Sequence, residues 1–244
     1  MLNLLIANRN LQNLQDLLNY ISLYIPDVRI SYLAKNGREA IHALYDYHYD
    51  MVLIDYKLQF YDGLDILEKL PIAKQNEYKN SIIFLSNDIT LAKNLKSHSM
   101  IFDSFLNTES FSVIISSLKK LVEVKQNNAN TTYIKTKIIN ELQMIGYNLA
   151  HNGTHYIAES ILLITTLNYD AENLSKNIYP KVSQIYHKSL NNIKTNIITA
   201  TDAAYENMNK IILKKHLQIP DNIKPTAKMI INAIVHKLKC YDSQ

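Results

Sequence analysis

Residues 51–67 read MVLIDYKLQFYDGLDIL, and this stretch decides the fold. Its first five residues are apolar up to a terminal aspartate, Asp55, which is typical of a strand buried on both faces. An Asp-Gly pair, Asp62 and Gly63, then opens a segment with helical spacing, DGLDILEKL. A buried strand followed directly by a helix predicts one β/α unit of a parallel sheet.

The same order of strand and helix recurs on both sides of this unit. Further strands are expected over 2–7, 28–34, 81–86 and 100–107, and each is followed by a helical pattern. Five such units predict a doubly wound, five-stranded parallel sheet with helices on both faces. In that fold, ligand chemistry lies at the carboxyl ends of the strands. Those ends carry Ala7, Asn8, Arg9, Asp55, Ser86, Asn107 and Thr108.

The composition excludes several classes of protein. Of the 244 residues, 47% are hydrophobic and 20% charged, which is typical of a globular chain. No apolar run approaches the ~20 residues of a membrane span. The single cysteine, Cys240, excludes an internal disulfide framework, and the four glycines lack the spacing of a phosphate-binding loop. No catalytic triad or carboxylate pair appears. We therefore expect a cytoplasmic protein that is not an enzyme and has no metal site, small-molecule substrate or membrane partner.

The chain is expected to divide near residue 125. Residues 1–122 have a net charge of −1, whereas residues 123–244 have a net charge of +5 that comes from lysine alone. The polar segment 123–131 lacks periodicity and predicts a linker. After it, residues 132–244 show only helical patterns, which predicts an all-α domain. A basic helical domain indicates an anionic partner.

The first half resembles the receiver domain of response regulators, which have a flavodoxin-like fold. The resemblance rests on MVLIDYKLQFYDGLDIL, on NGREAIHAL at the second helix, and on IIFLSND and SFLN near the later strands. It implies that Asp55 is the equivalent of the phosphoacceptor. It also implies that Ser86 is at the hydroxyl switch position and Phe105 near the aromatic switch position.

The charged residues of a receiver pocket are changed in this chain. Receivers hold Mg²⁺ with an acidic pair after the first strand, and here that pair is Asn8 and Arg9. They also use a lysine after the fifth strand, and here that position is Asn107 or Thr108. We therefore expect a pseudo-receiver without Mg²⁺ or another cofactor. Our hypothesis is that the Arg9 guanidinium replaces the metal and pairs with Asp55.

Other uses of this first domain stay open. Asp55 is either structural or still accepts phosphate by an unusual route. A receiver fixed in one state would serve as a module for homodimers or heterodimers, or would sense a ligand other than phosphate.

The second half resembles the DNA-binding domain of the stage zero sporulation protein A family. The resemblance rests on the stretch from Asn152 to Asn207, on Tyr179-Pro180, on Ala204-Tyr205, and on Lys224-Pro225-Thr226. It implies a helix-turn-helix with a scaffold helix over about 179–186 and a recognition helix over about 189–205. With the receiver-like domain in front, it implies a diverged paralogue of that family.

The expected recognition helix has one apolar stripe for the core and an opposite face for DNA. The stripe comprises Leu190, Ile193, Ile197, Ala200 and Ala204. The candidate DNA-binding residues are Lys188, Ser189, Asn191, Asn192, Lys194, Thr195, Ile198 and Thr199. The family's guanine-reading arginines fall on Asn192, Thr195 and Ile198. An asparagine reads adenine and an isoleucine contacts the thymine methyl, which predicts a more A·T-rich site on double-stranded DNA.

The loss of every arginine from the second half also supports a rival hypothesis. In this alternative the chain does not bind DNA. It associates instead with a true family member, or with its phosphorelay partners, and antagonises it.

Overall fold

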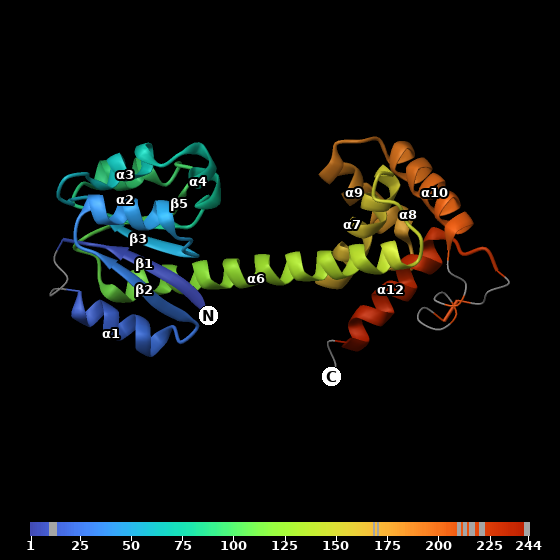
Figure 1. The fold of residues 1–244 in the computed structure, drawn as a ribbon, viewed down its shortest axis with the longest axis horizontal. Coiled ribbons are helices and arrows are strands. Elements are labelled where there is room, and N and C mark those ends of the chain that lie inside the picture. Colours follow the sequence, from blue (N-terminus) through green and yellow to red (C-terminus); the bar gives the residue numbers. More distant parts are fainter. Residues whose placement is uncertain are drawn as a thin grey trace. The chain divides into compact units, whose positions relative to one another are not determined.

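The computed structural model describes residues 1–9, 14–167, 169, 171–208, 211, 214, 218–219 and 223–241. The chain forms two compact units, Met1–Asn127 and Asn128–Gln244, which meet inside the segment 123–131. No helix in the described ranges is long and apolar enough to cross a membrane. Figure 1 shows a sheet with helices in the first unit and helices in the second.

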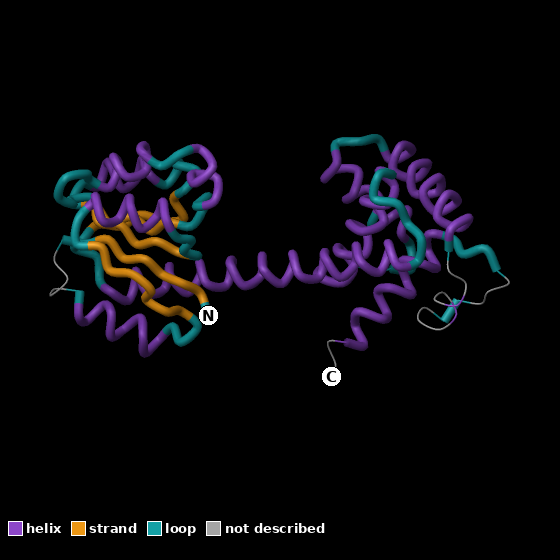
Figure 2. Tube along the Cα trace, viewed as in Figure 1, coloured by secondary structure: helices purple, strands orange, loops and turns teal. Residues whose placement is uncertain are grey.

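The first unit is built on five parallel strands. They are β1 (Leu2–Ala7), β2 (Val28–Ala34), β3 (Met51–Asp55), β4 (Ile82–Ser86) and β5 (Ile101–Leu106). Their order in the sheet is β2-β1-β3-β4-β5, which is the doubly wound, flavodoxin-like order. In this order β3 is central, because β1 and β4 pair with its two edges (Figure 2). Asp55 therefore ends the central strand.

Helices cover both faces of this sheet, because alternate side chains of each strand point to opposite faces. Leu4 and Ile6 of β1 pack in one core with α1 (Gln15–Tyr24) and the first turns of α6 (Phe111–Met144). Leu5 and Ala7 pack in the other core. That second core contains residues of α2 (Gly37–Asp46), α3 (Gly63–Lys69) and α5 (Ile89–Leu95).

Two features of the helices differ from the sequence-based expectation. A short helix, α4 (Ile72–Glu77), follows Pro71 and was not expected, because six residues are too few to show a periodic pattern. The segment 123–131 was expected as a linker, and it lies within the continuous 34-residue helix α6. Its polar side chains are largely exposed, so this part of α6 has no apolar face to bury.

Inside the second unit, α6 ends at a Schellman motif. The N–H of Gly146 donates to the carbonyl of Gln143, and the N–H of Tyr147 donates to the carbonyl of Leu142, both at 3.0 Å. Gly146 has φ +105°, which is the left-handed region that this motif favours for glycine. Tyr147 is buried beyond it, and its hydroxyl donates to Thr201 Oγ1 at 3.1 Å. Burial raises the pKa of Tyr147 to about 12.

Helices pack around one core in this unit. They are α7 (Asn152–Leu167), α8 (Leu174–Asn177), α9 (Tyr179–Tyr186), α10 (Leu190–Asn207), α12 (Ala227–Tyr241) and the end of α6. The described residues of this unit form no strand, so the fold class expected from the sequence, α/β followed by all-α, is confirmed.

Helices α7 and α10 cross closely at a glycine. A Cβ placed on Gly153 would lie 1.9 Å from the carbonyl oxygen of Asn196 and 2.7 Å from the Cβ of Ala200. Neither helix backbone can move without disturbing the core between them, because buried side chains of both helices fill it.

We therefore expect Gly153→Ala to destabilise the second unit by on the order of 1–3 kcal/mol, as overpacking does. Chemical denaturation followed by circular dichroism measures the change. Asn128→Ala is the control, because this exposed position on α6 can take an alanine without a clash. An unchanged midpoint for Gly153→Ala would show that α7 and α10 do not approach this closely.

Candidate functional site

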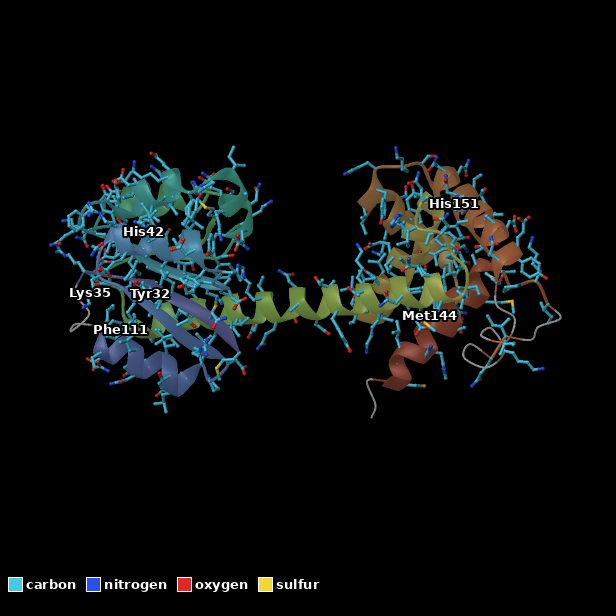
Figure 3. All side chains as sticks on the ribbon, in the orientation of Figure 1. Tyr32, Lys35, His42, Phe111, Met144 and His151 are labelled. Carbon is cyan, nitrogen blue, oxygen red and sulfur yellow. The ribbon has the colours of Figure 1, made fainter. Side chains whose placement is uncertain are left out.

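A pocket of about 300 Å³ lies at the carboxyl ends of the strands in the first unit. Its polar side chains come from the loops after β1 and β5 and from the last residue of β3, and its apolar ones come mainly from α1, α6 and β4. The lining residues are Asn8, Arg9, Leu14, Leu17, Asp55, Leu85, Asn107, Phe111 and Ile114. Phe111, labelled in Figure 3, is the first residue of α6. The pocket thus lies where the sheet topology predicts a ligand site.

Neutral amides surround the carboxylate of Asp55 in this pocket. Asn8 Nδ2 donates to Asp55 Oδ2 at 3.2 Å, and Asn107 Nδ2 donates to Asp55 Oδ1 at 3.2 Å. The backbone N–H of Lys57 also donates to Oδ1 at 3.2 Å. Asp55 is 6% exposed, so these donors replace much of its hydration. The structure therefore gives the carboxylate hydrogen bonds from uncharged groups.

A second amide keeps Asn107 in place. Its Nδ2 also donates to Asn87 Oδ1 at 2.6 Å, and its backbone N–H donates to the carbonyl of Ser86 at 2.8 Å. Asn87 was not expected as a site residue, since nothing in its sequence position shows that it faces Asn107. Between Asn107 and Thr108, which the sequence left open, the structure brings Asn107 to Asp55.

The expected ion pair between Arg9 and Asp55 does not form. Arg9 lines the same pocket with its side chain exposed, and no ion pair among the described residues includes it. The reason is geometric, since the amides of Asn8 and Asn107 already lie against the carboxylate. The hypothesis that the Arg9 guanidinium replaces the metal is therefore wrong. The amides of Asn8 and Asn107 contact the Asp55 carboxylate instead.

The remaining predicted pocket residues lie close in the fold but make other contacts. Ser86 is buried, and its hydroxyl donates to the carbonyl of Asp88 at 3.2 Å and accepts from the Asp88 N–H at 3.0 Å. The ring of Phe105 lies 5.6 Å from Lys96 Nζ. Thr108 is exposed. These three residues are not among those that line the pocket.

The pocket does not fit Mg²⁺, the cation that receivers hold. A hard divalent cation takes several oxygen ligands, with carboxylates among them, and Asp55 is the one carboxylate of the described lining. Across the described residues, no group of three histidines, cysteines or acidic residues could hold a metal ion. No chemical step through a metal follows from this arrangement.

The second unit contains the expected helix-turn-helix. Scaffold helix α9 has the predicted bounds and ends at His187, which has a left-handed backbone with φ 51°. The turn is closed by the Lys188 N–H, which donates to the Ser183 carbonyl at 3.1 Å, and by Ser183 Oγ, which donates to the Lys188 carbonyl at 2.5 Å. Ser189 then caps α10, because its Oγ accepts from the N–H of Asn192 at 3.2 Å.

Recognition helix α10 buries the predicted stripe and exposes the opposite face. Ile193, Ile197, Ala200 and Ala204 are buried, and Leu190 is partly buried against the same core. The exposed candidate residues are Lys188, Ser189, Asn191, Asn192, Thr195, Ile198 and Thr199, with Lys194 half-buried. They lie along the first half of α10 and in the turn before it, and together they define the candidate DNA-binding surface.

An ion pair at the far end of this surface was not expected. Lys224 Nζ lies 2.7 Å from Asp202 Oδ1 and 5.5 Å from the centre of the Tyr205 ring. The hydrogen bond that Lys224 donates to the Asp202 carboxylate raises the pKa of Lys224. The pair joins α10 to the segment before α12. Residues 202 and 224 are too far apart in the sequence for a pattern to predict their contact.

Comparisons with known proteins give matches to each unit. Residues 138–238 match the family model described as "Sporulation initiation factor Spo0A C terminal". The first unit is similar to the Francisella response regulator 1452 receiver domain, with 22% identity over 50% of this chain and 98% of that chain and a TM-score of 0.42. It is also similar to a LuxR-family DNA-binding response regulator from Staphylococcus aureus, with 19% identity over 50% and 98% and a TM-score of 0.42.

The sheet order and the family match describe different parts of the chain. The order β2-β1-β3-β4-β5, with Asp55 at the end of the central strand, is that of the flavodoxin-like fold. The family match covers α7 to α10 and most of α12, including the helix-turn-helix. Within the second unit, residues 138–238 are therefore similar to the C-terminal domain of the sporulation initiation factor Spo0A.

Proposed function

We propose that this response regulator binds double-stranded DNA through α10 and that its receiver works without phosphorylation of Asp55. The observation that carries the proposal is the helix-turn-helix itself. Its second helix buries one apolar stripe and leaves the opposite face exposed, and that face is polar apart from Ile198. A helix with this arrangement is the element that enters a major groove.

The charges at the start of α10 suit the DNA backbone. Lys188 lies in the turn, Lys194 lies on the second turn of the helix, and the Ser189 cap marks a helix N-terminus, where N–H groups bind phosphate. Such contacts fix the position of the helix and carry no sequence information by themselves.

The neighbouring side chains suit an A·T-rich site. Asn191 and Asn192 are exposed amides, which pair with adenine in the major groove. Ile198 is 59% exposed, and an aliphatic group of this kind contacts the methyl group of thymine. The bidentate contact of arginine to guanine has no equivalent, since residues 123–244 contain no arginine.

The first unit supports independence from phosphorylation. Transfer of a phosphoryl group needs cations to neutralise the charge that develops on its oxygens. Around Asp55 the structure places the amides of Asn8 and Asn107 instead, and Arg9 is the one cation that lines the pocket among the described residues. Dimers through this unit stay a prediction.

Lys194→Ala tests the backbone contact. We expect DNA affinity to fall for all sequences alike, and the slope of log K against log salt concentration to decrease by about 0.9, because one phosphate contact is lost. Fluorescence anisotropy with genomic fragments measures both quantities. Lys93→Ala on α5 is the matched control, because it removes an exposed lysine from the first unit.

The same anisotropy assay on the wild-type protein distinguishes DNA binding from the rival hypothesis, in which the chain does not bind DNA and antagonises a family member. A steep salt dependence with sequence preference supports DNA binding. Absence of binding at moderate salt, together with association with a full-length family member, would instead support the antagonist.

Ile198→Ser tests base readout. We expect this variant to lose on the order of 1 kcal/mol of discrimination between A·T and G·C at one position of the site, because the methyl contact is lost. Selection of binding sites from a random DNA library measures the preference. The thermal midpoint should stay unchanged, since the side chain is exposed. An identical selected site in both proteins would remove Ile198 from the reading surface.

Acetyl phosphate with Mg²⁺ tests the receiver. Intact mass should show no stoichiometric phosphorylation of Asp55 in the wild-type chain. The triple variant Asn8→Asp, Arg9→Asp, Asn107→Lys restores the charges of a receiver pocket and should gain Mg²⁺ binding in calorimetry. Stoichiometric modification of wild-type Asp55 would overturn this part of the proposal.

A further inference from the structure

The pocket at the end of the sheet carries two opposite charges that do not pair with each other. Asp55 supplies the carboxylate and Arg9 the guanidinium, and both line the same volume of about 300 Å³. We propose that this pocket binds a small zwitterion with an apolar body, namely an apolar α-amino acid. The proposal rests on the proposed function in one respect, because it needs an Asp55 that is not phosphorylated.

The Asp55 side of the pocket suits an ammonium group. A carboxylate offers about four lone-pair sites, and the three donors Asn8, Asn107 and Lys57 leave room for one more on Oδ2. All three donors are uncharged, so the negative charge of a side chain that is 6% exposed remains to be balanced. Buried charges are normally paired, and an ammonium supplies both a donor and the balancing charge.

The Arg9 side suits a carboxylate. A guanidinium presents a planar fork of donors that matches the two oxygens of a carboxylate. The Arg9 side chain is exposed at the pocket and is in no ion pair among the described residues. A ligand that carries both an ammonium and a carboxylate can contact Asp55 and Arg9 together.

The rest of the pocket suits an apolar side chain. Leu14 and Leu17 of the α1 region face it, as do Phe111 and Ile114 of α6. The volume lies at the lower end of the ~300–1,000 Å³ that is usual for ligand pockets, so the ligand must be small.

Other ligands of this size fit the pocket less well. A divalent cation would find no second carboxylate in the described lining of the pocket. An inorganic or acyl phosphate would place its negative charge beside that of Asp55. An amine without a carboxylate leaves the charge of Arg9 unpaired in the pocket, and an acid without an amine leaves Asp55 with uncharged donors alone. The zwitterion is the class that uses both charges and the apolar wall.

Isothermal titration calorimetry of the full-length protein tests the proposal with L-leucine and L-phenylalanine at millimolar concentrations. The matched analogues of leucine are 3-methylbutylamine, which lacks the carboxylate, and 4-methylpentanoate, which lacks the amine. We expect the amino acids to bind and each analogue to bind at least ten-fold more weakly, which corresponds to about 1.4 kcal/mol.

Two variants locate the site. Arg9→Gln and Asp55→Asn should each weaken binding of leucine at least ten-fold. Arg9 is exposed, so its variant keeps the fold even if Asp55→Asn does not. Tyr45→Ser, which alters an exposed residue of α2, is the control and should bind leucine as the wild type does.

The outcomes separate this inference from the proposed function. If neither amino acid binds, or if the analogues bind as well as leucine, the zwitterion site is overturned. The phosphorylation-independent receiver then still stands, provided that acetyl phosphate leaves Asp55 unmodified. If acetyl phosphate modifies Asp55, the proposed function fails by a separate measurement of mass.

Discussion

The first unit depends on how a buried carboxylate is held without a metal or a paired cation. Asp55 ends the central strand, and the amides of Asn8 and Asn107 reach it from the ends of β1 and β5. Removing one donor from a buried carboxylate leaves a desolvation penalty of about 1–3 kcal/mol or more. The three strand ends are therefore held together by the same carboxylate. Because the donors are neutral amides of the protein itself, they hold the Asp55 carboxylate without a bound metal ion or a phosphoryl group.

The output domain shows the same replacement of charged groups by amides and small side chains. Positions where the family resemblance places arginine carry Asn192, Thr195 and Ile198, and the structure leaves all three exposed on α10. Asn192 is also tied to its own helix, since its carbonyl accepts from Asn196 Nδ2 at 2.8 Å. The fold of each unit therefore does not by itself determine the chemistry of its surface.

Sequence patterns predicted the elements whose burial is periodic or complete. β2 and β3 have the expected bounds, and so does α9, because their apolar residues follow the period of a strand or a helix. The helix through 123–131 and the pair between Asp202 and Lys224 were missed, since neither leaves an apolar period. The Arg9 hypothesis was wrong because sequence order shows which charges end neighbouring strands, whereas side-chain direction decides which of them meet.

The position of the Asp202–Lys224 pair limits where DNA can contact α10. The N-terminal half of the helix carries Lys188, Lys194 and the positive end of the helix dipole. The C-terminal half exposes Asp202 and Glu206, which repel phosphate. Lys224 forms an ion pair with Asp202, so one lysine faces two acidic residues there. If α10 binds DNA as proposed, we expect backbone contacts at the start of the helix. In that arrangement Asn191, Thr195 and Ile198 are the side chains expected to face the base edges.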